Sequence, residues 1–236
     1  MSIRAVLFDL DDTLFDHHAG MRAGVRAARA LHTGLASRPF DEVVADHSRI
    51  LEEMHIEFLA GRVTFEGAWV ERFRRLLTQY ELDHEPQTPV ELAATYRAAM
   101  VSSRRIVPGA DDLLQCLRGR VSIGIVTNNT RREQETKLAH LGLDQYVDDL
   151  VTSEEIGAAK PSPEIYHAAL QRVGCRADEA VMLGDNWYND VHGATLVGIR
   201  AIWLNRHGLD NPDPRLAPEI NALLPVESTA ALILGD

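Results

Sequence analysis

Short apolar runs rich in β-branched residues recur along the chain. They lie at Ile3–Phe8, Val121–Val126, Leu150–Val151, Val181–Leu183 and Ala201–Leu204, with a weaker one at Ile220–Leu224. Stretches with apolar residues at helical spacing separate the later runs. This alternation is typical of a parallel β-sheet that helices cover on both faces, so the pattern predicts an α/β fold.

The segment from residue 16 to residue 102 has a different pattern. It contains no strand-like run, and its apolar positions recur every three or four residues. One such series comprises Val43, Val44, His47, Ile50, Leu51, Met54 and Phe58. We therefore predict an all-helical domain over residues 16–102, inserted into a core made of residues 1–15 and 103–236.

Local signals mark the ends of some elements. Thr130 and Glu133 have the spacing of a capping box, and Ser162 followed by Pro163 is typical of a helix N-terminus. The last thirty or so residues instead contain prolines at positions 212, 214, 218 and 225. We predict an irregular segment there, wrapped around the core.

The first apolar run ends in an acidic segment. Asp9, Asp11 and Asp12 follow Phe8 closely, and Thr13 comes next. If the run is a buried parallel strand, these carboxylates lie at the carboxyl edge of the sheet, where open α/β folds bind ligands. Asp9 and Asp11 could then address one reacting group together. A solvated acidic turn is the alternative interpretation of this segment alone.

Three later segments place further polar side chains beside predicted strands or helix starts. They are Thr127-Asn128-Asn129, Lys160 just before Ser162, and Gly184-Asp185 followed by Asn189-Asp190. Each alone also has a plain structural interpretation, as a turn, a solvated lysine or a helix cap.

Together, these segments predict a cluster of polar residues at one edge of the sheet: Asp9, Asp11, Thr127, Lys160, Asp185 and Asp190. Carboxylates gathered in one cleft repel each other strongly unless a cation holds them. A set of ligands made only of oxygen favours Mg²⁺ over zinc or copper. A lysine, a threonine and backbone amides beside that metal suit a phosphoryl group with its spread negative charge.

The whole chain resembles the haloacid dehalogenase-like (HAD) superfamily, because these segments follow one another in the same order as the motifs of that superfamily. The four motifs of that superfamily correspond to Asp9-x-Asp11-x-Thr13, Thr127, Lys160, and Gly184-Asp185 with Asn189-Asp190. The resemblance implies a Rossmann-like, three-layer α/β/α core, and the helical insertion is similar to the C1-type cap of subfamily I. The implied activity is Mg²⁺-dependent hydrolysis of a small phosphomonoester, such as a nucleotide, a sugar phosphate or phosphoglycolate.

The resemblance also implies the catalytic roles. Asp9 would attack phosphorus and form an aspartyl-phosphate intermediate, while Asp11 would protonate the leaving alkoxide and later deprotonate the hydrolytic water. The 2-haloacid dehalogenases of the superfamily lack an aspartate two positions after the nucleophile and need no metal, so Asp11 favours a phosphatase. A 2-haloacid dehalogenase, a phosphomutase and a non-catalytic protein that binds a phosphorylated ligand are the alternatives.

The binding roles follow from the same resemblance. Mg²⁺ would be held by Asp9, the backbone carbonyl of Asp11, and Asp185, with Asp190 acting through water or by orienting Lys160. The phosphoryl oxygens would be held by Thr127 and Lys160, with Asn128 as a further donor.

The composition of the chain excludes some kinds of partner and some kinds of site. The chain has 24 Lys and Arg against 35 Asp and Glu, a net charge of −11, which disfavours nucleic acid and anionic membranes as partners. Its cysteines, Cys116 and Cys175, form no CxxC pair, so a disulfide framework or zinc cluster is excluded and a cytoplasmic location is expected. No apolar stretch approaches the roughly 20 residues of a membrane span. The oligomeric state is left open.

Overall fold

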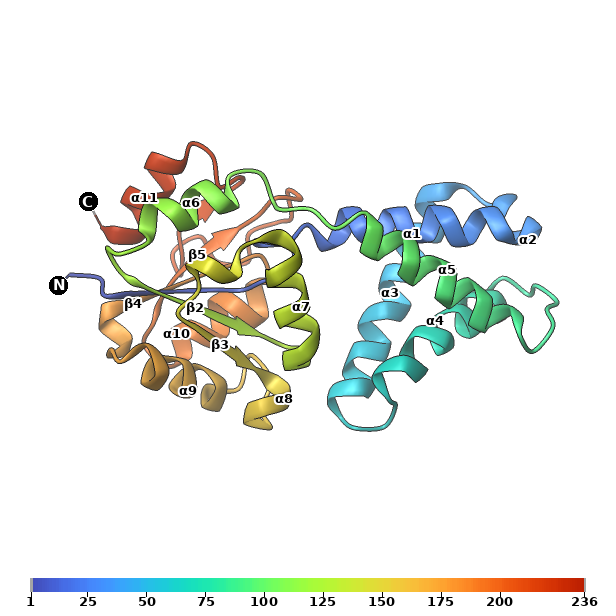
Figure 1. The fold of residues 1–236 in the computed structure, drawn as a ribbon, viewed down its shortest axis with the longest axis horizontal. Helices are drawn as coiled ribbons and strands as arrows, with labels where there is room; N and C mark the ends of the chain where they lie inside the picture. The colour runs from blue at the N-terminus through green and yellow to red at the C-terminus, as the bar shows by residue number, and fades with distance from the viewer. Residues whose placement is uncertain (1, 236) are drawn as a thin grey trace. The chain divides into compact units, whose positions relative to one another are not determined.

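The chain divides into two units in its structure, a computed structural model that describes residues 2–235 (Figure 1). One unit combines the segment up to Asp16 with the segment from Arg105 onward, and the other is His17–Arg104. No helix within residues 2–235 is both long enough and apolar enough to cross a membrane.

A six-stranded parallel sheet forms the centre of the first unit, which confirms the predicted α/β class. Its strands, in spatial order, are β3 (Asp149–Thr152), β2 (Ser122–Thr127), β1 (Ala5–Phe8), β4 (Ala180–Gly184), β5 (Arg200–Leu204) and β6 (Glu219–Ile220). The chain builds β2 and β3 on one side of β1 and then places β4 on the other side. This reversal is the topological switch point at which such sheets open a crevice.

Helices cover both faces of the sheet, as in a Rossmann-like fold. Val6 and Phe8 belong to one core with residues of α6 (Ala110–Leu117), α7 (Arg131–Leu141) and α11 (Val226–Leu234). Leu7 belongs to a second core with residues of α9 (Pro163–Val173) and α10 (Gly193–Leu196). Successive side chains of a strand point to opposite faces, and this alternation separates the two cores. Figure 1 shows α6 and α11 on one side of the sheet and α9 on the other.

Shorter elements complete this unit. They are α8 (Ser153–Ile156), two 3₁₀ turns at Asp144–Tyr146 and Ala177–Glu179, and a π-helical turn at Trp187–His192. The predicted cap at Thr130 is confirmed, because its hydroxyl accepts a hydrogen bond from the backbone N–H of Glu133 at 3.3 Å.

The prediction of an irregular C-terminal segment is wrong for its last part, which forms helix α11, whereas β6 overlaps the weaker apolar run at Ile220–Leu224. Pro225 is the N-cap residue of α11 and has an extended backbone, a position whose N–H makes no hydrogen bond within the helix, so proline is tolerated there. Ala230 and Ile233 then pack into the core, which gives the helix a buried face.

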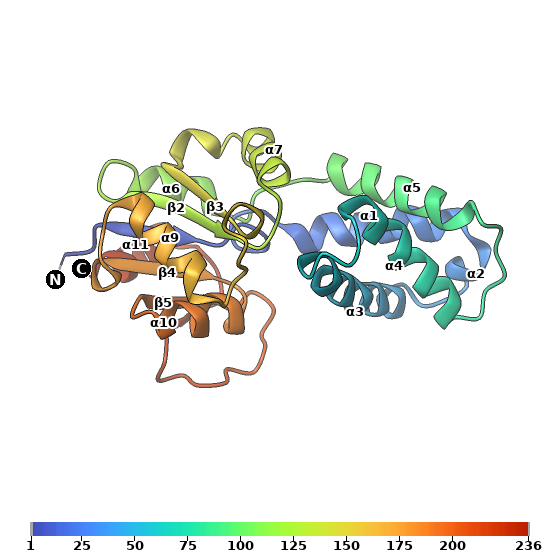
Figure 2. The same ribbon diagram turned by 90° about the horizontal axis from the view of Figure 1, so that it is seen from below.

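The second unit consists of helices, as the apolar spacing predicted. They are α1 (His17–Leu31), α2 (Thr33–Ala36), α3 (Phe40–Leu59), α4 (Phe65–Gln79) and α5 (Thr88–Ser102). Helices α1 and α5 pack side by side (Figure 2). A Cβ atom at Gly24 of α1 would lie 2.6 Å from the ring of Tyr96 in α5, so a glycine is required for this close approach.

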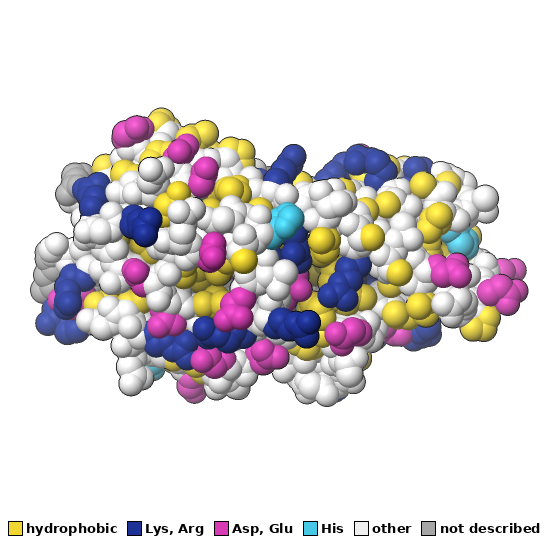
Figure 3. All heavy atoms as spheres, in the orientation of Figure 1, with side chains coloured by type: hydrophobic (Ala, Val, Ile, Leu, Met, Phe, Trp, Pro, Cys, Tyr) yellow, Lys and Arg dark blue, Asp and Glu magenta, His cyan; other side chains and the backbone are white. Residues whose placement is uncertain are grey.

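Charges of both signs are mixed on the molecular face shown in Figure 3. Ion pairs between surface residues include Arg131 with Glu155 at 2.9 Å and Arg172 with Asp149 at 3.1 Å. Exposed pairs of this kind contribute about 0–1 kcal/mol each, so they do not determine the fold.

Candidate active site

A buried lysine lies between two carboxylates at the carboxyl edge of the sheet. The Nζ atom of Lys160 is 2.6 Å from Oδ1 of Asp9 and 2.7 Å from Oδ1 of Asp190. Asp9 directly follows β1, Asp190 belongs to the π-helical turn after β4, and Lys160 precedes α9. The lysine side chain is 3% exposed, and Asp190 is fully buried. Three distant segments therefore meet at the predicted place.

A third carboxylate completes an acidic group next to this lysine. Oxygen atoms of Asp9, Asp185 and Asp190 all lie within 4.8 Å of one another. Asp190 reaches this position because residue 184 is glycine: a Cβ atom there would lie 2.3 Å from Oδ2 of Asp190. The backbone N–H of Asn186 donates to the same oxygen at 2.9 Å.

Burial and mutual repulsion raise the pKa values of Asp9 and Asp185. Burial raises the pKa of Asp9 to about 7, because it outweighs the attraction of Lys160 and is reinforced by the charge of Asp190. Burial, with Asp9 and Asp190, also raises the pKa of Asp185 well above its ordinary value. Burial alone would lower the pKa of Lys160, but the carboxylates of Asp190 and Asp9 raise it, so the ammonium stays charged.

One ammonium cannot neutralise three carboxylates. The excess negative charge is what a divalent cation would offset, and the available donors are all carboxylate oxygens. Such hard oxygen ligands fit Mg²⁺. The side chains of Asp9, Asp185 and Asp190 are therefore chemically suited to hold Mg²⁺.

The Asp11 side chain is held by helix α7. Its Oδ1 accepts a hydrogen bond from Nζ of Lys137 at 2.6 Å, and its Oδ2 accepts one from Nε2 of Gln134 at 3.0 Å. Gln134 also donates to Oγ1 of Thr127 at 2.6 Å, which connects two of the predicted site residues. Lys137 and Gln134 are buried, and the sequence analysis missed both.

Asn128, which follows β2, forms hydrogen bonds with the backbone of Lys160. Its Oδ1 accepts from the backbone N–H of Lys160 at 2.7 Å, and its Nδ2 donates to the Lys160 carbonyl at 2.9 Å. Both atoms of the amide group are therefore used on the backbone. In this structure Asn128 positions Lys160, whereas the sequence analysis expected it to donate to a phosphoryl group.

Two further side chains fix Asp185. The Thr13 hydroxyl accepts a hydrogen bond from the Asp185 backbone N–H at 3.1 Å, and Nε1 of Trp203 donates to the Asp185 carbonyl at 2.8 Å. Trp203 lies opposite Gly184 in the register of β4 and β5, so the neighbouring strand supplies this support. Trp203 was also missed as a site residue.

The loop after β1 has a left-handed residue at its turn. Asp12 has a φ of 62°, a conformation that aspartate tolerates better than most residues. The Arg206 guanidinium donates to the Asp12 carbonyl at 3.1 Å, and Arg105 pairs with Asp16 at 2.8 Å. These contacts hold the loop that carries Asp11.

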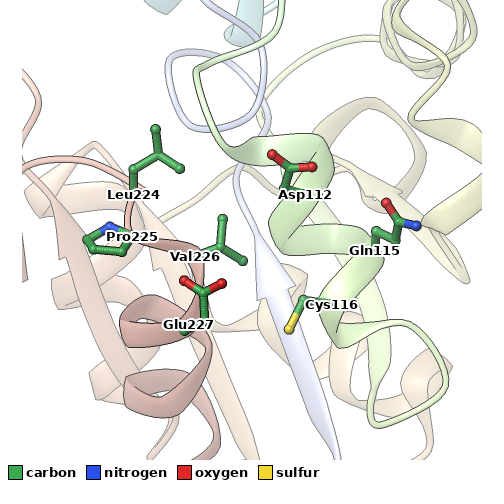
Figure 4. A pocket seen from close by; sticks show the side chains of 7 residues that line it. All are labelled: Asp112, Gln115, Cys116, Leu224, Pro225, Val226 and Glu227. Carbon is green, nitrogen blue, oxygen red and sulfur yellow. The ribbon is translucent and has the colours of Figure 1, made fainter.

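A separate surface cavity of about 530 Å³ lies between α6 and α11 (Figure 4). Its lining residues are Asp112, Gln115, Cys116, Leu224, Pro225, Val226 and Glu227. None of them belongs to the cluster at the carboxyl edge of the sheet. The candidate chemistry is therefore at the sheet edge and not in this cavity.

Comparison with known families gives one clear match. The family described as haloacid dehalogenase-like hydrolase matches residues 3–198, which include every residue of the cluster.

The proteins that this chain is similar to include phosphatases and dehalogenases. The chain is 30% identical to a phosphoserine phosphatase of Thermus thermophilus, over 92% of this chain and 94% of the relative. It is similar to the structure of the HAD-hydrolase YfnB of Bacillus subtilis bound to magnesium, with 25% identity, a TM-score of 0.77, and coverage of 98% and 99% of the two chains. It is also similar to a 2-haloacid dehalogenase of Pseudomonas syringae, with 26% identity, a TM-score of 0.64, and coverage of 98% and 99%.

Proposed function

Because the chain belongs to the haloacid dehalogenase-like hydrolase family, we propose that it is a phosphatase that hydrolyses a small phosphomonoester. The observation that carries this proposal is the presence of two kinds of acid at one edge of the sheet. Oxygen atoms of Asp9, Asp185 and Asp190 lie together as a cation site would require, and Asp11 lies two positions after the candidate nucleophile. A halide leaves without a proton, whereas an alkoxide needs one, so a second acid beside the nucleophile suits phosphate esters.

In this proposal Asp9 is the nucleophile. A carboxylate oxygen of Asp9 attacks phosphorus, the bond to the ester oxygen breaks, and Asp11 gives its proton to the leaving alkoxide. Asp11 then removes a proton from a water molecule, which attacks the aspartyl phosphate and releases inorganic phosphate and Asp9. The contacts of Asp11 with Lys137 and Gln134 would hold the acid between these two steps.

Lys160 and Thr127 would bind the non-bridging oxygens of the phosphoryl group. The charged ammonium of Lys160 is fixed by Asp9 and Asp190, so little reorganisation is needed when an anion arrives. Asp9, Asp185, Asp190 and the Asp11 carbonyl would hold Mg²⁺. When bound, the cation would offset the negative charge of the carboxylates and of the phosphoryl oxygens.

We further propose that the helical unit acts as a cap that excludes water and selects the substrate. Its insertion between β1 and α6 supports this role, as does the likeness of the chain to YfnB, whose structure reveals interdomain movement.

Both cysteines are free thiols, which supports the expected cytoplasmic location.

The test is phosphate release from a panel of phosphomonoesters, measured with Mg²⁺ and with EDTA. We expect release that requires Mg²⁺ and that is lost in the Asp9→Asn variant, which serves as the blank. Halide release from 2-haloacids without phosphate release would instead identify a dehalogenase. Isomerisation of a sugar phosphate without phosphate release would identify a mutase.

A further inference from the structure

A group of polar side chains lies buried inside the helical unit without hydrogen-bond partners. It consists of His47 from α3, Trp69 and Arg72 from α4, and Tyr96 from α5, and we name it the buried donor cluster. Among residues 2–235, the structure gives no partner to Nδ1 or Nε2 of His47, Nε1 of Trp69, Nε of Arg72 or the hydroxyl of Tyr96. Each of these side chains is at most 8% exposed.

The members of the cluster are in direct contact. The ring of His47 is 4.7 Å from that of Tyr96, and the ring of Trp69 is 5.5 Å from Tyr96. The guanidinium carbon of Arg72 is 4.9 Å from the centre of the Trp69 ring. The four side chains therefore form one continuous group within the helical unit.

Arg72 makes this group unusual. Within residues 2–235 its Nε is buried without a hydrogen-bond partner, although a buried charge is normally paired. Its contact with the face of Trp69 offsets only part of the desolvation cost. Burial lowers the pKa of Arg72, and the opposing effects of Tyr96 and Glu52 are too small to reverse this shift.

The hydrogen-bonding chemistry of the cluster indicates what is missing. Arginine and the indole N–H are donors only, tyrosine can donate, and neutral histidine donates from one ring nitrogen. The cluster therefore offers several donors and one positive charge but contains no carboxylate. A group with several acceptor oxygens and a negative charge would pair with these N–H and O–H donors and with the charge of Arg72.

We infer that the buried donor cluster binds an oxyanion, a phosphate or carboxylate group, inside the helical unit. The oxyanion has two possible sources: a free anion, or a second anionic group on the substrate. The second source rests on the proposed phosphatase activity, whereas the binding site itself does not.

The first experiment measures thermal unfolding in EDTA, with sodium phosphate titrated against sodium chloride at matched ionic strength. We expect a saturable rise in Tm of about 5 °C for the wild type. Arg72→Met, which keeps the bulk and removes the charge, should lose this rise. Tyr96→Phe, which removes one hydroxyl, should reduce it.

Two controls isolate the cluster. Arg75→Met changes a partly exposed, ion-paired arginine of the same helix and should keep the response. Lys160→Met removes the lysine of the sheet edge and should also keep it, which separates this site from the proposed catalytic one. A rise of equal size in Arg72→Met, or no rise in the wild type, would overturn the free-anion form of the proposal.

The second experiment identifies the source, using ethyl phosphate and phosphoglycolate, which differ by one carboxylate. If the substrate supplies the oxyanion, Arg72→Met should lower kcat/KM for phosphoglycolate by about 10- to 100-fold relative to ethyl phosphate. Equal kcat/KM changes for the two substrates, with the Tm response present in the wild type, would identify a free anion. The inference fails if neither experiment distinguishes Arg72→Met from Arg75→Met. If no substrate is hydrolysed but the Tm response is specific, the proposed function fails and the site stands.

Discussion

The protein buries positive charge in two places, and it neutralises that charge in only one. At the sheet edge, Lys160 contacts two carboxylates at 2.6 and 2.7 Å. In the helical unit, Arg72 lies against an aromatic ring and has no carboxylate partner among residues 2–235. The first region has more negative than positive charge, whereas in the second the charge of Glu52 is too weak to offset the burial of Arg72. Each therefore has an unmet electrostatic need, and the two needs have opposite sign.

This contrast has a consequence for what each region binds. In the proposed function the sheet edge binds a cation together with the phosphoryl group, because the carboxylates of Asp9, Asp185 and Asp190 outnumber the ammonium of Lys160. The buried donor cluster needs an anion. Substitutions that remove one charge at a time should therefore affect the two regions in opposite ways.

The largest effect is expected from Asp9→Asn. This change removes the proposed nucleophile but keeps its shape and leaves Lys160 paired with Asp190. We expect turnover to fall by about 10⁴-fold or more, with a circular dichroism spectrum like that of the wild type. Phosphate release under saturating substrate measures the loss. Retention of more than a few per cent of the activity would remove Asp9 from the nucleophile role.

A matched pair of substitutions tests the contrast directly. Lys160→Met leaves two buried carboxylates without their cation, so we expect it to lower the free energy of unfolding in EDTA by about 3 kcal/mol. Arg72→Met removes a charge that has no partner, so it should leave this free energy unchanged or raise it. Urea denaturation of both variants provides the comparison. Similar losses in the two variants would show that Arg72 is neutralised as Lys160 is.

The sequence predicted the sheet edge better than its supports. Asp9 and Asp185 directly follow strands that pair in parallel register, with Phe8 opposite Leu183, so the topology alone brings them together. Lys137 and Gln134 lie on α7, where polar residues dominate and no apolar stripe marks the buried face. Their burial results from the packing of α7 beside Asp11 and could not be deduced from spacing.

The same limit applies to the helical unit. The sequence correctly predicted that His47 belongs to the buried series of α3, because it lies at helical spacing from the apolar residues of that helix. The pattern gives the buried position but not the neighbours, so it did not show that His47, Arg72 and Tyr96 meet. These contacts come from three different helices, whose mutual packing is a tertiary property.

A smaller catalytic effect is expected from Lys137→Met. Lys137 holds Oδ1 of Asp11, so its loss should let the proposed acid take other orientations. We expect kcat to fall by about 100-fold with little change in KM, since general acid–base catalysis contributes about 10²–10⁴-fold. Arg132→Met, an exposed change on the same helix, is the control. Equal kcat values for the two variants would show that Asp11 does not depend on this contact.

The smallest effect concerns the pH dependence of stability in the helical unit. Burial, with the nearby charges of Arg72 and His17, lowers the pKa of His47 to about 3. The folded protein therefore keeps His47 neutral, while in the unfolded chain the same ring takes up a proton below its ordinary value of 6.5. Because the folded pKa is the lower one, the stability from this site is complete above pH 6.5 and is lost as the pH falls toward 3. The loss should be about 1.4 kcal/mol for each pH unit below 6.5.

His47→Phe isolates this contribution, because phenylalanine keeps a ring between Phe73 and Tyr96 at a similar size. The difference in unfolding free energy between wild type and variant should be constant from pH 8 to pH 7. It should then change in favour of the variant by about 2 kcal/mol on going to pH 5. Urea denaturation in chloride buffer with EDTA keeps oxyanions and metal out of the comparison. A constant difference down to pH 5 would mean that His47 accepts its proton in the folded state. A partner would then have to stabilise that charge, and the helical unit would resemble the sheet edge after all.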